Sequence, residues 1–442
     1  MHPGSKIDAK ATLGISGIRE EAAKSGIQGF IRLKPDDGSV ALANHVILIL
    51  DLTASMSRNL GALQSSLFQI VEKLQTNRDK CTIIGFAGRT QKTNPDGAEV
   101  FRKFMRINDL KEDIPEMKIM GGTTDFICGL NKAFEVVKEL EIEYGDGYPN
   151  HGNESMQWNS HNHIAIFMTD GKNYGNVPWQ AVEKLKSENV TLHTIGLRKQ
   201  IDTSVRKNLM KMAKIGSGGF SFSRSMEEFN KRVETLLGLT LDAVTKPTTL
   251  RLFTQPDVEL NYATILGHPE QYADEENPEF NLPALKSSER KILLFEVALN
   301  KAYPKNMRVP LLKCTSNPNY FDGEGILVST PVMPKKNFLN LLSRGSNADL
   351  RVHLLMHQIE NNLEKALEEA VEKDNIDGFK AKASTSLQNA RERVEEEFAK
   401  HPKRPILIEH ITMLKESIQS AETITDPREF FSTIYAIMRT TR

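Results

Sequence analysis

The sequence predicts an α/β domain with a doubly wound, mostly parallel sheet and helices on both faces. This domain is inserted in, or joined to, an antiparallel β-sandwich, and a C-terminal helical domain follows. Three observations predict this fold class. Strand and helix patterns alternate over residues 44–240. Short strand patterns separated by Pro, Asn and Gly occupy residues 245–335, and apolar stripes at helical spacing occupy residues 346–442.

The first strand of the α/β region leads directly into a polar loop. Residues 46–50 (VILIL) are consecutive apolar residues, which predicts a buried strand because the run is too short for a helix. Asp51 ends the run, and Thr53 and Ser55 follow at alternate positions. A helical pattern begins a few residues later, with apolar residues at Leu60, Leu63, Leu67, Ile70 and Leu74. Ligands of open α/β sheets bind at the carboxyl ends of strands, so this loop is the first candidate site.

The residue types in the loop predict a metal ion with hard oxygen ligands. The pattern D-x-T-x-S offers one carboxylate and two hydroxyls, which suits the oxygen coordination of Mg²⁺. Two later segments fit the same centre. GGTTDF (residues 121–126) places Thr123 after a glycine pair, just before a helical stretch, and IAIFMTDG (residues 164–171) is a buried strand ended by Asp170.

In these three segments the sequence resembles the von Willebrand factor A (VWA) domain and its metal-ion-dependent adhesion site. The family pattern is D-x-S-x-S, a distant Thr after a glycine pair and a distant Asp in a D-G turn. The resemblance implies five metal-site residues: Asp51, Thr53, Ser55, Thr123 and Asp170. Thr53 replaces the first serine of the pattern but keeps its hydroxyl. The resemblance covers about residues 44–240 and implies Mg²⁺ as cofactor, with Mn²⁺ or Ca²⁺ as alternatives, and a partner protein that supplies a Glu or Asp to the metal.

Composition bounds the remaining possibilities. The 442 residues suffice for two or three domains, and 57 acidic against 57 basic residues leave no global field for nucleic acid or an anionic membrane. The longest apolar runs are far shorter than a membrane span, and the first residues lack the apolar segment of a secretion signal. Three cysteines form no disulfide framework, which favours a reducing, cytoplasmic location. A protein exported without a cleavable signal, including one acting inside a host cell, would look the same.

The chain in order yields further expected elements. In the N-terminal segment, residues 1–43, one strand is expected at Ile27–Pro35. A lone strand is not stable, so we expect it to pair with the sandwich. Four more strands and two helices are expected in the VWA region: strands at Cys81–Ala87, Ala98–Met105, Val190–Gly196 and GFSFS near residue 220, and helices at Thr203–Lys214 and up to about Leu239. Residues 143–161 are expected to form a polar surface loop.

The sandwich and the tail are predicted from pattern alone. The sandwich strands are expected in TLRLFTQ, ERKILLFEVAL, MRVPLLKCT and EGILVSTPV. Similar pairings of a VWA domain with a sandwich occur in bacterial VWA proteins that resemble calcium-activated chloride channel regulators, and in inter-alpha-trypsin inhibitor heavy chains. Four apolar stripes predict helices in the tail, around Val352–Val371, Phe379–Phe398, Ile408–Ile418 and Phe430–Ile437. We expect these helices to pack on each other and on the sandwich.

Simpler interpretations of the polar residues were weighed. Asp51, Thr53 and Ser55 could cap a helix, but that leaves Thr123 and Asp170 unexplained. A haloacid-dehalogenase-type phosphatase would need an acid at position 53, and a dinucleotide fold would need glycines in the first turn. We expect His161 and His163 to lie in a surface loop, and Asp125 to cap the following helix.

The leading functional hypothesis is a protein-binding module that depends on Mg²⁺ and is not an enzyme, possibly as a secreted effector. The sequence contains no nucleophile with a base, no P-loop and no paired general acids. One alternative is a regulatory subunit of an ATP-driven complex, like the VWA subunits of chelatases. A weaker alternative is a metal-dependent hydrolase.

Overall fold

The computed structural model divides the chain into two compact units. The α/β unit contains residues 40–247, and the sandwich unit contains residues 4–39 and 248–442. The structure describes residues 6–400 except 15–17, 20–25, 37–38, 40, 75–78, 89–95, 107–113, 115–116, 145–160, 172, 177, 198–202, 224–228, 230–232, 234–236, 238–240, 242, 267, 274–276, 283, 318–319, 322–324, 335–346 and 374, together with residues 412, 414, 415, 418 and 419. The expected surface loop at 143–161 lies mostly outside the described residues.

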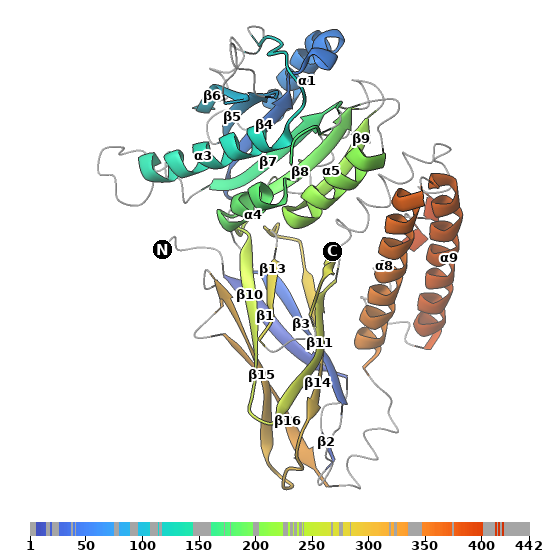
Figure 1. Cartoon of the computed structure of the whole chain (residues 1–442). Coiled ribbons are helices and arrows are strands. Elements are labelled where there is room, and N and C mark those ends of the chain that lie inside the picture. Colours follow the sequence, from blue (N-terminus) through green and yellow to red (C-terminus); the bar gives the residue numbers. More distant parts are fainter. Residues whose placement is uncertain are drawn as a thin grey trace. The chain divides into compact units, whose positions relative to one another are not determined.

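A six-stranded sheet forms the centre of the α/β unit, with the strand order β6-β5-β4-β7-β8-β9 (Figure 1). Neighbouring strands are parallel except β5 and β6, which are antiparallel. The strands are β4 Ala43–Asp51, β5 Lys80–Phe86, β6 Ala98–Arg106, β7 His161–Thr169, β8 Val190–Leu197 and β9 Ser217–Ser223. The predicted α/β fold class is confirmed, with one antiparallel edge strand that makes the sheet mixed.

Helices cover both faces of this sheet. They are η1 Ala54–Arg58, α1 Leu60–Lys73, α3 Phe126–Tyr144, α4 Trp179–Ser187 and α5 Thr203–Ile215. On one face, Val46, Leu48 and Leu50 of β4 belong to the same apolar core as Leu63 and Leu67 of α1. On the other face, Phe126 of α3 packs edge-on against Phe86 and Phe167 of the strands. Figure 1 shows α3, α4 and α5 together over this second face. Because successive side chains of a strand point to opposite faces of the sheet, alternate residues of β4 face the helices on opposite sides.

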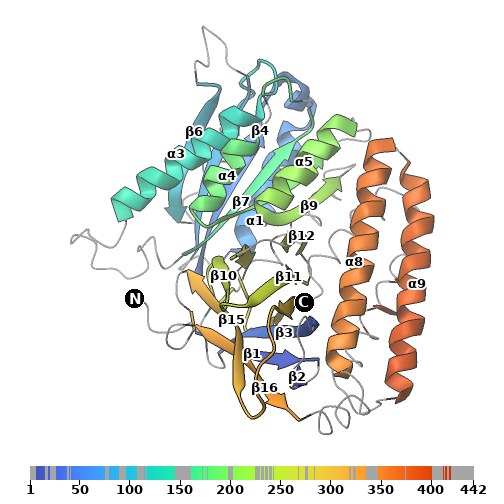
Figure 2. The same ribbon diagram turned by 60° about the horizontal axis from the view of Figure 1, so that its bottom comes forward.

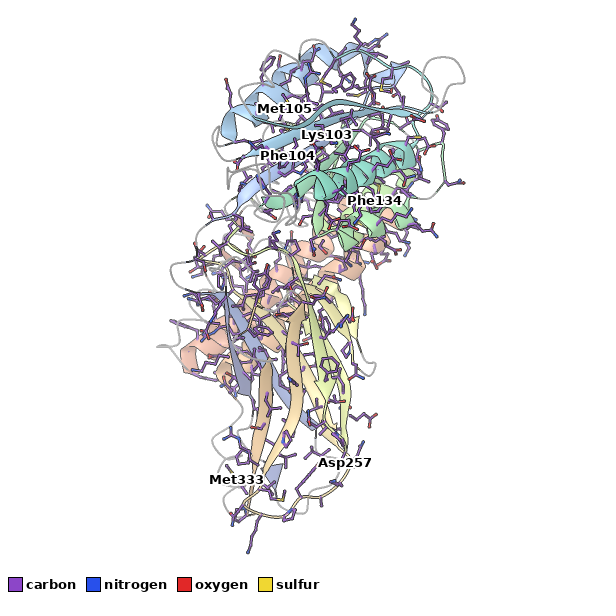
Figure 3. The ribbon with its side chains drawn as sticks, turned by 90° about the vertical axis from the view of Figure 1, so that its left-hand side faces the viewer. Lys103, Phe104, Met105, Phe134, Asp257 and Met333 are labelled. Atoms are coloured by element: carbon purple, nitrogen blue, oxygen red, sulfur yellow. The ribbon has the colours of Figure 1, made fainter. Side chains whose placement is uncertain are left out.

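The edge strand β6 is irregular. Its pairing with β5 shifts register twice, and Phe104 has a positive φ of 52°. Lys103 turns its ammonium group toward α3, where it contacts Glu139 at 3.0 Å and Glu143 at 3.2 Å. Lys103, Phe104 and Met105 are labelled on this strand in Figure 3. Bulges and charged side chains on an edge strand hinder pairing with another sheet, so β6 ends the sheet.

The expectation that His161 and His163 lie in a surface loop is wrong. β7 begins at His161, which pairs with Ala43 at the start of β4, so both histidines belong to the sheet. Their exposed fractions are 0% and 3%. The apolar run alone predicted a strand from Ile164, because polar residues at a strand start resemble a loop in sequence.

Two five-stranded sheets form the sandwich, in the orders β1-β3-β14-β11-β12 and β13-β10-β15-β16-β2. All pairs are antiparallel except the two-residue pairing of β2 with β16. The strands are β1 Ile7–Leu13, β2 Ile18–Arg19, β3 Gly26–Pro35, β10 Thr248–Thr254, β11 Val258–Ile265, β12 His268–Ala273, β13 Glu279–Leu282, β14 Lys291–Leu299, β15 Arg308–Asn317 and β16 Ile326–Met333. Met333 and Asp257 are labelled at one end of these sheets in Figure 3.

The strand predicted at Ile27–Pro35 pairs as expected. As β3, it lies between β1 and β14, with Ile31 opposite Leu293 in the latter. The chain therefore leaves the sandwich sheet after β3, forms the α/β unit, and returns at β10. Both sheets contribute buried side chains to one apolar core, including Leu33, Leu252, Phe295 and Leu312.

Two long helices complete the described part of the sandwich unit. α8 (Ala348–Lys373) and α9 (Ile376–Lys400) lie side by side in Figures 1 and 2. Leu350 of α8 is buried with Phe30 and Leu294 of the sandwich, which confirms the expected packing on the sandwich for α8. Of the expected third helix only a few helical residues are described, among them the buried Leu414. The fourth lies outside the described residues, and the predicted domain boundaries at 335 and 346 stay predictions.

No described helix combines the length and the apolar character that a bilayer crossing requires.

Candidate functional site

The loop after β4 holds its first carboxylate in a fixed position. Asp51 is the last residue of β4, and its side chain is 1% exposed. Its Oδ1 atom accepts hydrogen bonds from the backbone N–H of Thr53 at 3.0 Å and from Thr53 Oγ1 at 2.7 Å. The loop thus folds back on the strand end, and Thr53 is 3% exposed. Neither Thr53 at the start of η1 nor Asn59 at the start of α1 makes a side-chain capping bond, so helix capping does not explain this motif.

Four oxygens from two strand ends form a connected series. Thr53 Oγ1 bonds Asp51 Oδ1 at 2.7 Å, Thr53 Oγ1 and Ser55 Oγ are 3.0 Å apart, and Ser55 Oγ donates to Asp170 Oδ1 at 2.7 Å. We call these atoms of Asp51, Thr53, Ser55 and Asp170 the oxygen series. Ser55 is exposed, whereas Asp51 and Asp170 are buried. The series therefore reaches from the buried sheet edge to solvent.

Thr169 orients the buried carboxylate from the neighbouring strand. Its Oγ1 donates to Asp51 Oδ2 at 2.5 Å and accepts from the N–H of Gly171 at 3.0 Å. Thr169 is fully buried, so this pair of bonds fixes Asp51 and the turn after Asp170 together. The motif search on the sequence missed Thr169. Strand alternation could have found it, because Thr169 occupies the last position of β7 on the face that Asp51 occupies on β4.

Burial dominates the electrostatics of Asp51. It raises the pKa of Asp51 to about 6, against the hydrogen bonds from Thr169 and Thr53, which lower it. The carboxylate of Asp170 raises that pKa further. Two carboxylates held near each other with little solvent favour a cation between them.

Thr123 lies beside Gly88, which follows β5 in the sequence. It is exposed, and its side-chain oxygen lies against the backbone of Gly88, where any Cβ atom would collide with it. The neighbouring Thr124 is 4% exposed. A Cβ atom added to Gly171 would lie 2.6 Å from Thr124 Oγ1 and 3.4 Å from Asp51 Oδ2, so Thr124 lies close to the carboxylate. The structure thus brings four of the five predicted residues together and places a second threonine beside them.

The two outer loops of the site are tied to the start of α3. Asp125 Oδ1 accepts from the N–H of Ile127 at 3.1 Å, which confirms Asp125 as the helix cap. Asn173 Oδ1 accepts from the N–H of Phe126 at 3.1 Å, and the N–H of Tyr174 donates to Thr124 O at 2.9 Å. Hydrogen bonds therefore join the described residues of the loop after Asp170 and of the loop with the glycine pair into one rim. Asn173 carried no sequence signal, because the bond joins residues 47 positions apart.

The donor set fits Mg²⁺ by its chemistry and spacing. Six oxygens at about 2.1 Å from Mg²⁺ lie roughly 3.0 Å from their neighbours, and Thr53 Oγ1 and Ser55 Oγ are 3.0 Å apart. Carboxylate and hydroxyl oxygens are the hard ligands that this ion prefers. Within the described residues, no group of three or more His, Cys, Asp or Glu side chains is placed to hold a metal. A softer transition-metal centre is therefore not indicated there.

Comparisons with known proteins agree with this fold. Residues 45–236 match the model of the von Willebrand factor type A domain, and this part of the chain is a VWA domain, a common protein-interaction module. No curated protein matches the chain by sequence.

Two solved structures align with almost the whole chain. One is a von Willebrand factor type A protein from Catenulispora acidiphila, with a TM-score of 0.65, 13% identity, and coverage of 100% of this chain and 99% of that one. The other is the ArnB paralog VWA2 from Sulfolobus acidocaldarius, with a TM-score of 0.55, 16% identity, and coverage of 99% of both chains. At such low identity these similarities concern the fold alone.

Proposed function

We propose that the VWA domain is a metal-dependent protein-binding module whose site is the carboxyl edge of its sheet. Asp51, Thr53, Ser55 and Asp170 would hold Mg²⁺, and Thr123 would join them by resemblance to the adhesion site of the family. The oxygen series carries this proposal, because it joins two carboxylates from separate strands through two hydroxyls. When bound, the cation supplies a positive charge and a coordination position that a partner's Glu or Asp can fill.

The protein residues have separate roles in this proposal. Thr169 fixes the carboxylate of Asp51 from behind, through the 2.5 Å bond to its Oδ2. Ser55 bridges to Asp170 while remaining open to solvent, so it marks the side from which a partner approaches. The hydroxyls carry no charge, and two carboxylates balance one divalent cation. A partner's carboxylate would therefore bind by filling the remaining coordination position of the cation rather than by neutralising excess charge.

No observation favours a hydrolase at this edge. The buried His45, His161 and His163 lie at the amino ends of β4 and β7, away from Asp51 and Asp170 at the carboxyl ends. Among the described residues of the oxygen series and its supports, none is an imidazole or thiol that could act as base or nucleophile. Nothing in the described residues favours a regulatory subunit of an ATP-driven complex either.

A matched pair of serines tests the metal site. Ser55 belongs to the oxygen series, whereas Ser57 is an exposed serine two residues later in the same loop. We expect Ser55→Ala to lower the affinity for Mg²⁺ and Mn²⁺ by on the order of tenfold or more, while Ser57→Ala leaves it unchanged. Isothermal titration calorimetry measures both variants, and equal affinities for them would refute the assignment of Ser55.

A displayed library of random peptides tests the partner chemistry. The full chain is immobilised and peptides are selected once with Mg²⁺ and once with EDTA. We expect peptides recovered only with Mg²⁺ to be enriched in Asp or Glu, and Ser55→Ala to lose that enrichment. Recovery of the same peptides in EDTA would contradict a metal-dependent module.

A further inference from the structure

An exposed aromatic side chain stands on the rim of the candidate site. Tyr174 is 71% exposed, four residues after Asp170. The other large apolar side chains exposed in the described part of the chain lie elsewhere: Ile142, Phe253, Met307 and Leu327. Of these, Ile142 is in α3 of the same unit, and the rest belong to the sandwich unit. Tyr174 alone among them lies within four positions of a residue of the oxygen series in the sequence.

The loop that carries Tyr174 is held by hydrogen bonds. On one side of it, Asn173 Oδ1 accepts from the N–H groups of Phe126 at 3.1 Å and Gly175 at 3.2 Å. The side-chain amide of Asn173 also donates to Asn176 O at 3.0 Å. Tyr174 itself donates its backbone N–H to Thr124 O at 2.9 Å. The backbone is thus fixed on both sides of Tyr174, although its ring faces solvent.

Gly175 shows how closely this loop fits the neighbouring one. A Cβ atom at position 175 would collide with the carboxylate of Asp125, so a side chain there would require that carboxylate to move. The bond to Thr124 holds the backbone of Tyr174, while its side chain is exposed. Gly175 therefore packs closely against the neighbouring loop, and the large ring of Tyr174 lies directly beside it in the sequence.

The ring lies within reach of a partner bound at the oxygen series. Gly171 is next to Asp51, since a Cβ atom added to it would lie 3.4 Å from Asp51 Oδ2. Tyr174 is three positions after Gly171, so their Cα atoms are at most about 11 Å apart. A peptide segment in extended conformation covers that span with three to four residues. A partner whose carboxylate is at the metal therefore places a nearby side chain at Tyr174.

Exposure of a ring on a rigid loop suits binding rather than folding. Tyr174 contributes little to the core, because most of its surface is in water. On association, such a ring gains apolar contact at a reduced entropic cost, since hydrogen bonds already hold the backbone beside it. Tyrosine also offers a hydroxyl that stays at the wet margin of an interface. Asn173, Gly175 and Asn176 beside the ring are uncharged, whereas Lys172 lies two positions earlier in the sequence and Asp125 of the neighbouring loop carries a carboxylate.

We infer that Tyr174 is a specificity-determining residue, and that it selects partner segments with an apolar side chain within a few residues of the metal-binding carboxylate. This inference rests on the proposed function, because the carboxylate positions the partner. The ring, not the phenol group, is the feature that selects. Tyr174→Phe should therefore behave like the wild type, whereas Tyr174→Ala should lose the preference.

The peptide selection in Mg²⁺ tests this inference with four full-length proteins: the wild type, Tyr174→Ala, Tyr174→Phe and Ile142→Ala. Ile142 is 68% exposed on α3 and serves as the matched control for removal of an exposed apolar side chain. For the wild type, we expect the recovered acidic peptides to carry an apolar residue within about four positions of the acid. Tyr174→Ala should keep the acid but lose the apolar residue, and its affinity for a wild-type peptide should fall by on the order of tenfold.

The outcomes separate the two proposals. Metal-dependent acidic peptides with the same apolar neighbour in the wild type and Tyr174→Ala would overturn the role of Tyr174 alone. Enrichment of Arg or Lys beside the acid, lost in Tyr174→Ala, would overturn the apolar preference and indicate cation–π recognition instead. Absence of any metal-dependent acidic peptide would overturn both proposals. Equal melting temperatures of the four proteins show that they are folded and comparable.

Discussion

The two edges of the VWA sheet carry different polar groups on the same strands. At the carboxyl edge, β4 and β7 lead into Asp51 and Asp170, whose oxygens connect through Ser55 to solvent. At the amino edge, the same strands begin with three buried histidines, His45, His161 and His163, which we call the histidine cluster. About six residues of β4 separate the two edges, roughly 20 Å.

The histidine cluster is closed by its own contacts. His45 Nδ1 lies 3.3 Å from His163 Nδ1, and His45 Nε2 lies 2.8 Å from Thr82 Oγ1. The ring of Phe104 stands edge-on against His45 and His161. The contrast with the oxygen series shows that polar residues at a strand end do not by themselves make a site. Access to solvent and chemically suitable ligands must come together, and only the carboxyl edge has both.

The strongest test of this contrast exchanges one hydroxyl for a methyl group at each edge. Thr169 and Thr82 are both fully buried, and each hydroxyl bonds a side chain of β4. We expect Thr169→Val to lower the affinity for Mg²⁺ by about 10- to 100-fold, because it frees the Asp51 carboxylate from its second anchor. Thr82→Val should leave metal affinity unchanged but lower the free energy of unfolding by about 1–3 kcal/mol, because its hydroxyl bonds His45 and the Phe104 N–H.

Calorimetry gives the affinities, and urea unfolding gives the stabilities. The contrast between the two edges would be wrong if both variants lowered the affinity for Mg²⁺, or if both lowered only the free energy of unfolding. A loss of metal affinity in Thr82→Val would mean that the two edges are coupled through β4.

Sequence patterns predicted most of the α/β unit because its strands are continuous apolar runs. VILIL and IAIFM are buried on both faces, so no alternative structure fits them. Four residues of the candidate site followed from their positions after these strands. The sandwich was less visible: β1 buries mainly Ile7, β12 contains a proline and β13 has four residues. Such strands are stabilised by partners distant in sequence, which a local pattern does not reveal.

Side-chain environment was the other quantity that the sequence did not give. His161 and His163 were expected in a loop, since histidine is common on surfaces, and only the pairing of β7 with β4 buries them. Likewise, Thr169 and Asn173 bond residues 118 and 47 positions away. These supports depend on the register between strands and loops, whereas the residues of the oxygen series follow local motifs.

The second test uses pH, to which the histidine cluster should respond. Burial lowers the pKa of His45 well below its ordinary value, and His161 lowers it further. The unfolded chain takes up a proton on His45 below about pH 6.5, while the native protein does not. The contribution of the neutral, buried His45 to the free energy of unfolding should therefore be fully present above that pH and should fall as the pH decreases. If a histidine stays neutral in the native protein down to pH 5, the free energy of unfolding falls by about 2 kcal/mol between pH 7 and pH 5.

A variant isolates this effect from other groups. The raised pKa of Asp51, about 6, has the opposite sign, because protonation of the native carboxyl adds stability as the pH falls through that value. We therefore compare the wild type with His45→Gln, in which Asp51 is unchanged. The difference in unfolding free energy between the two proteins should shrink from pH 7 to pH 5. A constant difference would show that His45 takes up its proton over the same pH range in the native and the unfolded protein.

The smallest expected effect concerns the two adjacent threonines at the carboxyl edge, Thr123 and Thr124. Resemblance to the family assigns the metal contact to Thr123, which is exposed, whereas Thr124 is buried next to Gly171 and Asp51. An exposed hydroxyl can turn toward a cation with little rearrangement, while the backbone carbonyl of Thr124 is already engaged with Tyr174 and fixes that residue. We expect Thr123→Val to lower the affinity for Mg²⁺ by about tenfold and to change the unfolding free energy by less than about 0.5 kcal/mol. Thr124→Val should leave the affinity within about twofold of the wild type. Calorimetry with Mg²⁺ on both variants decides between the two threonines. A larger loss of affinity in Thr124→Val than in Thr123→Val would assign the metal contact to the buried threonine. The metal-binding oxygens around Asp51 would then be enclosed by protein, as the histidine cluster is.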